Sequence, residues 1–190
     1  GEMIEGVDIA PANIKAGMDI IVSGTLGDHA ATVMAARHGL TLPPEIQSDC
    51  APLCHLTAAM IAAAGDGIAV LRDPTRGGAA ASLNELAEAA GVGILLDEAA
   101  IPVHPAVQGV CDILGFDPLT LANEGKLLAF VPPEDTARVL AVMHADPHGR
   151  SACVIGRTTA EAAGTVGLRT ALGGIRVVDM PLGELVPRIC

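Results

Sequence analysis

The chain has 190 residues, with 22 acidic and 11 basic side chains, and its formal net charge is −11. Phosphate binding requires a basic face, so this balance argues against nucleic acid as a partner. The sequence contains two Phe and neither Trp nor Tyr, which excludes a surface that grips bases by aromatic stacking. No apolar run approaches the roughly 18–20 residues that span a bilayer, so no membrane partner is expected.

Apolar runs, glycine stops and prolines predict a chain of alternating strands and helices. In chain order we expect a strand at 19–24, helices at 28–37 and 51–64, a strand at 68–71, a helix at 74–90, a strand at 93–97, a helix at 105–114, a strand at 126–131, a helix at 134–144, and strands at 153–156, 166–169 and 175–178. This order predicts an α+β domain whose mixed sheet is flanked by helices. We expect that domain to cover residues 1–178.

The two ends of the chain differ from this pattern. The sequence begins Gly-Glu-Met and has no basic segment followed by an apolar one, so we expect no secretory signal and a cytoplasmic location. We interpret Gly1 as a cut inside a longer chain. Residues 179–190 contain two prolines and end in Cys190, and we expect them to form a flexible tail that could reach about 36 Å when extended.

The five cysteines are an odd number, which without an export signal favours reduced thiols. Cys50, Cys54 and His55 suggest a metal site, but structural zinc requires four ligands, and no second ligand pair lies nearby. We therefore expect no metal, and we interpret Cys50 and Cys54 as small side chains that line a buried helix start. Cys111 and Cys153 lie in apolar runs and are expected in the core.

The first candidate motif is Asp-Pro-Thr-Arg-Gly-Gly at 73–78, between a predicted strand and a predicted helix. Asp73 is expected to cap the helix, with Pro74 at its first position. Gly77 and Gly78 would then leave N–H groups free for an anion at the positive end of the helix, and Arg76 would add a bidentate donor. A plain capped turn is the alternative interpretation.

The second motif is Asn-Glu-Gly-Lys at 123–126, just before a predicted strand. It places an amide, a carboxylate and an ammonium group around one glycine, and the carboxylate could act as a general base. On the residues alone, a polar turn leading into a strand is the favoured interpretation. The third feature is the tail, because a thiol on a long tether can visit another active site, whereas a frayed end is the alternative.

These three segments, together with 169–174 and 178–180, resemble the HypE family of hydrogenase maturation proteins over essentially the whole chain. The terminal Pro-Arg-Ile-Cys is highly specific. The Asp-x-Thr-Arg-Gly-Gly loop is shared with the wider superfamily of aminoimidazole ribonucleotide synthetase and selenophosphate synthetase. The resemblance implies the fold of that superfamily's C-terminal domain. It also implies an N-terminal domain, absent from this chain, that carries the dimer contact and most of the ATP and Mg site.

The resemblance further implies an ATP-dependent carbamoyl dehydratase, with Cys190 as the covalent carrier and Glu124 as the base. The carbamoyltransferase HypF would load Cys190, and dehydration would leave a thiocyanate. Its cyano group would pass to the iron of a [NiFe]-hydrogenase precursor on the HypC–HypD complex. The full-length protein would be a homodimer, and this fragment alone would be inactive. The residues expected in the phosphate or tail cleft are Asp73, Thr75, Arg76, Gly77, Gly78, Asn123 and Lys126.

Two other functions remain open from the sequence. A phosphate-activating synthetase of the same superfamily would fit the loop at 73–78, but it does not require a terminal cysteine. A non-catalytic docking module could use a Cys-tipped tail to bind partners. Covalent chemistry at Cys190 distinguishes these alternatives from the dehydratase.

Overall fold

The computed structural model describes residues 6–181 of the chain. Its sheet has the strand order β2-β4-β1-β5-β3-β6-β7, and β3 and β6 are the parallel neighbours in an otherwise antiparallel arrangement. The strands are β1 (Asp19–Val22), β2 (Val70–Arg72), β3 (Gly93–Asp97), β4 (Leu128–Val131), β5 (Cys153–Thr159), β6 (Val166–Arg169) and β7 (Ile175–Val177). The predicted mixed sheet is therefore confirmed.

The central strands are buried on both faces. In β1, Ile20 and Val22 pack into one core cluster, whereas Ile21 between them packs into another. In β4, Leu128 and Phe130 contribute to the first cluster, and the residues that alternate with them contribute to the second. Because successive strand side chains point to opposite faces, a continuous apolar run is what a strand between two helical layers requires.

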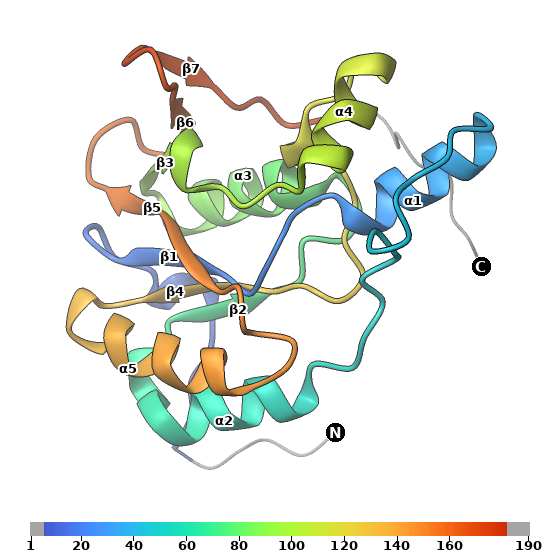
Figure 1. Ribbon diagram of the computed structural model, residues 1–190. Helices are drawn as coiled ribbons and strands as arrows, with labels where there is room; N and C mark the ends of the chain where they lie inside the picture. Colours follow the sequence, from blue (N-terminus) through green and yellow to red (C-terminus); the bar gives the residue numbers. More distant parts are fainter. Residues whose placement is uncertain (1–5, 182–190) are drawn as a thin grey trace.

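Helices cover both faces of this sheet (Figure 1). Helix α3 (Gly78–Ala90) supplies the first cluster, and helices α2 (Cys54–Ala64) and α5 (Pro133–Ala145) supply the second. Helices α1 (Asp28–Arg37) and α4 (Pro105–Leu114) pack against each other around a third, smaller cluster. The predicted α+β class, a mixed sheet flanked by helices, is confirmed.

The start of helix α3 differs from the prediction. The helix begins at Gly78, and its N-cap is Gly77, with φ of 72° and no side-chain cap. Asp73 and Pro74 therefore do not cap it. The N–H of Gly78 instead donates to the carbonyl of Thr75 at 2.9 Å, which closes a turn ahead of the helix.

The interpretation of Cys50 and Cys54 was also wrong, because both side chains are exposed. Helix α2 begins at Cys54, three residues after the predicted start, so Cys50 lies in the preceding loop. Cys111 is buried as predicted, and Cys153 is half-buried against the first core cluster. Within residues 6–181, no helix is long and apolar enough to cross a membrane. In the same part of the chain, no group of three His, Cys, Asp or Glu side chains is arranged to hold a metal ion.

Candidate functional site

Asn123 connects the two predicted motifs. Its side chain is 1% exposed, and its amide nitrogen donates to the carbonyls of Pro74 at 3.1 Å and Leu121 at 2.9 Å. Its amide oxygen accepts from the N–H of Gly27 at 2.8 Å, in the loop after β1. The N–H of Asn123 also donates to the Pro74 carbonyl. Asn123 therefore joins three loops, and its amide is engaged by backbone groups of those loops.

The side chain of Glu124 is exposed at this junction, whereas its backbone is fixed. The N–H of Glu124 donates to Oδ1 of Asp49 at 3.0 Å. Oδ2 of the same carboxylate accepts from Nζ of Lys126, also at 3.0 Å. Asp49, in the loop before helix α2, thus bonds to the residues on both sides of Gly125.

Lys126 lies between two carboxylates and is 11% exposed. Its ammonium nitrogen is 3.0 Å from Asp49 and 3.7 Å from Asp28. Burial raises the pKa of Asp28 above its ordinary value, although a hydrogen bond from the Thr25 hydroxyl and the charge of Lys126 act in the opposite direction. Within residues 6–181, Oδ1 of Asp28 is buried and has no hydrogen-bond partner. The charge of Lys126 is therefore already compensated internally.

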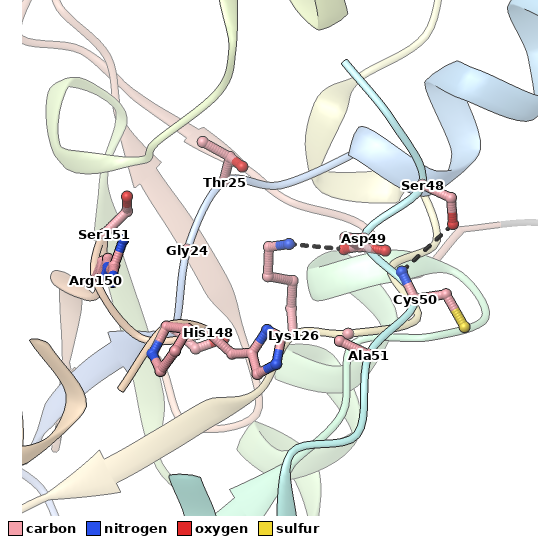
Figure 2. A pocket seen from close by; sticks show the side chains of 13 residues that line it. Gly24, Thr25, Ser48, Asp49, Cys50, Ala51, Lys126, His148, Arg150 and Ser151 are labelled. Atoms are coloured by element: carbon pink, nitrogen blue, oxygen red, sulfur yellow. Dashed lines mark hydrogen bonds and ion pairs between the residues drawn. The ribbon is translucent and has the colours of Figure 1, made fainter. Parts of the chain in front are cut away.

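A cavity of about 310 Å³ opens beside Lys126 (Figure 2). Figure 2 shows the Lys126 side chain ending at Asp49, with Cys50 next to Asp49 in the same loop. His148 and Arg150 line the cavity from the segment that follows helix α5. The polar and charged lining includes Ser23, Thr25, Ser48, Asp49, Lys126, His148 and Arg150.

The two glycines of the first motif have a steric role. Gly78 has φ of 64°, and a Cβ there would lie 2.5 Å from the carbonyl oxygens of Leu119 and Leu121. A Cβ at Gly77 would lie 2.6 Å from the Cβ of Ala81. Since the Gly78 N–H already donates to Thr75, the prediction that both glycines leave N–H groups free is wrong for Gly78.

The polar side chains of that motif face solvent to different degrees. Asp73 and Arg76 are exposed, and Thr75 is half-buried with its hydroxyl 3.4 Å from Oδ2 of Asp73. Arg76 forms no ion pair with any residue in the described part of the chain. Among residues 6–181, the guanidinium group of Arg76 is therefore without an ion-pair partner. It lies at the turn that Asn123, the neighbour of Glu124, contacts through Pro74.

The end of the described chain lies beside the same turn. The carbonyl of Val178 accepts from Asn84 of helix α3 at 2.9 Å. A Cβ at Gly77 would be 3.7 Å from Cγ of Pro181. The chain therefore leaves the described region next to the first motif. The predicted carrier Cys190 and most of the predicted tail lie outside the described residues.

Sequence reasoning missed Asp49 and Asp28. Asp28 opens a predicted helix, where an acidic residue is common, and Asp49 lies in a loop between two helices. No motif connects either residue with 123–126, because the contacts of Asp49 join positions 75 and 77 residues apart. The sequence contains no signal for them, because Asp28 and Asp49 are distant from Lys126 along the chain and meet it only in the folded structure.

Two curated relatives are similar to this chain over its whole length. "Carbamoyl dehydratase HypE" of Rhodobacter capsulatus is 53% identical over 190 residues, which are all of this chain and 56% of that relative. The protein of the same name from Bradyrhizobium diazoefficiens is 47% identical over 190 residues, which are all of this chain and 55% of that relative. The chain therefore spans about half the length of the curated relatives it matches.

Solved structures of HypE proteins superpose on this chain. A crystal structure of the hydrogenase maturation protein HypE superposes with a TM-score of 0.91 at 41% identity, over 96% of this chain and 58% of that one. A HypE structure in complex with ATP gives 0.89 at 40% identity, over 96% and 55%. A HypE–HypF complex gives 0.87 at 39% identity, over 93% and 57%.

These likenesses confirm the predicted resemblance to HypE and to the synthetase superfamily. The matched stretch, residues 15–169, contains the sheet up to β6, both motifs and the loops that Asn123 joins. The chain belongs to the family described as AIR synthase related protein, C-terminal domain.

Proposed function

We propose that this chain is the C-terminal part of an ATP-dependent carbamoyl dehydratase that supplies the cyanide ligand for [NiFe]-hydrogenase maturation. The observation that carries the proposal is the junction at Asn123, which bonds the backbone next to the exposed residue Glu124 to the turn at 73–78. Pro181, the last described residue and part of the predicted tail, lies at that same turn. The backbone next to Glu124, the cationic turn and Pro181 therefore lie at one edge of the domain.

The chemistry requires each of these parts. A carbamoyl group on the Cys190 thiol is R–S–CO–NH₂, and its oxygen is a poor leaving group until it is phosphorylated. ATP, as co-substrate, supplies that phosphoryl group. Departure of phosphate and loss of both N–H protons gives R–S–C≡N. Glu124 is the proposed acceptor of an N–H proton, since a positioned carboxylate can serve as a general base. Cys190 is the covalent carrier.

The described residues fit a supporting role toward the nucleotide phosphates. Arg76 is exposed at the turn before helix α3, and a guanidinium group binds phosphate oxygens well. Lys126 is less suited to that role, because two carboxylates already compensate its charge. We propose that ATP and Mg are bound mainly by the half of the relatives that this chain does not span, and that these 190 residues alone are inactive.

A solved relative supports one proposed partner, and the others are implied by the family resemblance. One solved relative is a HypE–HypF complex, and we propose that a HypF-type carbamoyltransferase loads Cys190. Transfer of the cyano group to a HypC–HypD-type scaffold and homodimerisation of the full-length protein are further parts of the proposal.

The test is intact-mass analysis of the full-length protein incubated with the carbamoyltransferase, carbamoyl phosphate and ATP. We expect a carbamoyl adduct that is replaced by a thiocyanate adduct, and no adduct in Cys190→Ala. A stable complex with the transferase but no mass change would contradict the proposal and favour a docking module. Consumption of ATP that activates an added small molecule, with Cys190 unmodified, would favour a synthetase.

A further inference from the structure

We propose that Asp49 is a positioning residue for the dehydration step, holding Glu124 and Lys126 in one fixed arrangement. The inference rests on the proposed function and adds to it a residue from outside both motifs. Asp49 comes from the loop between helices α1 and α2, and its two carboxylate oxygens serve two different partners.

The geometry separates the two tasks of the carboxylate. Oδ1 accepts from the Glu124 N–H at 3.0 Å, and Oδ2 accepts from the Lys126 ammonium at 3.0 Å. The Asp49 side chain is 3% exposed, so the carboxylate that accepts both hydrogen bonds is largely shielded from water. A charge-assisted hydrogen bond is stronger than a neutral one, and shielding strengthens it further. The backbone at Glu124 is therefore fixed while its side chain stays exposed.

Backbone packing reinforces the same contact. A Cβ at Gly125 would lie 1.8 Å from the carbonyl oxygen of Asp49 and 2.9 Å from the N of Ala51. Real Cβ atoms do not approach backbone this closely, so only glycine allows the two segments to meet. The loop around Asp49 and the second motif therefore form one unit, with the carboxylate fastening both sides of Gly125.

Of the two carboxylates near Lys126, Asp49 is the closer, at 3.0 Å against 3.7 Å for Asp28. Asp49 is also the one that contacts Glu124. Removing it would release the Glu124 backbone and leave Lys126 with its more distant partner. A misplacement of about 1 Å at a reacting group can cost about 100-fold in rate. The loss should fall on the chemical step, because no contact of Asp49 is assigned to ATP.

The experiment measures single-turnover conversion of the carbamoyl adduct to thiocyanate in the full-length protein. Four variants are compared with wild type: Asp49→Ala, Asp49→Asn, Glu124→Gln, and the double variant Asp49→Ala with Glu124→Gln. Asn keeps an oxygen for the Glu124 N–H but loses the ion pair with Lys126. Asp19→Asn is the matched control, since Asp19 is a buried carboxylate that binds Arg157 and Thr136 at the opposite end of β1.

We expect Asp49→Ala to convert the adduct about 100-fold more slowly with the KM for ATP unchanged, and Asp49→Asn to fall about 10-fold. If Asp49 acts through Glu124, the double variant is no slower than Glu124→Gln alone. If Asp49 were merely structural, the double variant would lose the product of the two single-variant losses, and Asp19→Asn would lose as much rate as Asp49→Asn. Either result would overturn the proposal. Asp49→Asn tests the same point if Asp49→Ala does not fold. Normal conversion by both Asp49 variants overturns this inference alone, whereas wild type that forms no thiocyanate overturns the proposed function and this inference with it.

Discussion

Replacing Asn123 by Ala should destabilise the chain more than any other single polar truncation at this edge of the sheet. The side chain makes three hydrogen bonds, to Gly27, Pro74 and Leu121. The Pro74 carbonyl keeps its bond with the backbone N–H of residue 123 after truncation. The N–H of Gly27 and the carbonyl of Leu121 each lose the partner that Asn123 supplies, and both residues are buried.

The magnitude follows from these two groups. Leaving a buried backbone group without its partner costs about 1–3 kcal/mol, so two groups at about 1.5 kcal/mol each give a loss of about 3 kcal/mol. The free energy of unfolding is measured by urea denaturation of the 190-residue chain. Asn84→Ala is the control, because Asn84 also donates to two carbonyls but is only half-buried. We expect it to cost about 1 kcal/mol, since water can replace its side chain.

The comparison can refute the reasoning. If Asn123→Ala costs no more than Asn84→Ala, the Asn123 amide does not hold the three loops together, and the proposed shared edge loses its support. If Asn123→Ala unfolds the chain entirely, Asn123→Asp supplies the measurement. It keeps the acceptor for Gly27 but replaces the donor to Pro74 and Leu121 with an oxygen, and it should still cost more than Asn84→Ala.

Three further outcomes are expected. Gly78→Ala should cost about 2 kcal/mol or more beyond Gly91→Ala in urea denaturation, because both positions have φ near 65° but only Gly78 has carbonyl oxygens 2.5 Å from the new Cβ; equal losses would exclude a steric role. In the full-length protein, Glu124→Gln should still be carbamoylated but should dehydrate about 10²–10⁴-fold more slowly, and a normal rate in the mass assay would show that another group is the base. Burial raises the pKa of Asp28 above 3.8, so its contribution to stability is highest below 3.8 and falls as pH rises through the folded-state pKa. Asp28→Asn should therefore gain stability relative to wild type as pH rises above about 4, and a pH-independent difference in urea denaturation would contradict this.

Local patterns in the sequence were sufficient for several elements. The bounds of helices α1 and α4 agree with the prediction at both ends, because α1 is an Ala-rich run that stops before Gly39 and α4 begins with Pro105 and stops before Gly115. A proline at the first helical position and a glycine after the last are signals contained within the element itself. Strand order is different, since it depends on pairings such as β1 with β5, more than 130 residues apart.

The first motif shows how a local signal can mislead. Asp73 followed by Pro74 has the composition of a helix start, yet helix α3 begins at Gly78. The carbonyl of Thr75 accepts from Gly78, and Gly77 adopts a left-handed conformation that only glycine adopts at little cost. The turn between strand and helix is four residues longer than the capping pattern predicts, and packing of Gly78 against the segment at 119–121 decides its length.

The residues of the second motif differ in how much they contribute to the fold. Asn123 is buried and bonded to three backbone groups, and Gly125 is in close contact with the loop around Asp49. The Glu124 side chain is exposed and forms no hydrogen bond with any residue between 6 and 181. Substituting Asn123 or Gly125 should therefore change stability, whereas substituting the carboxylate of Glu124 should leave stability almost unchanged. The proposed role of Glu124 as a base is compatible with this arrangement, because its carboxylate is exposed while its backbone N–H is bonded to Asp49.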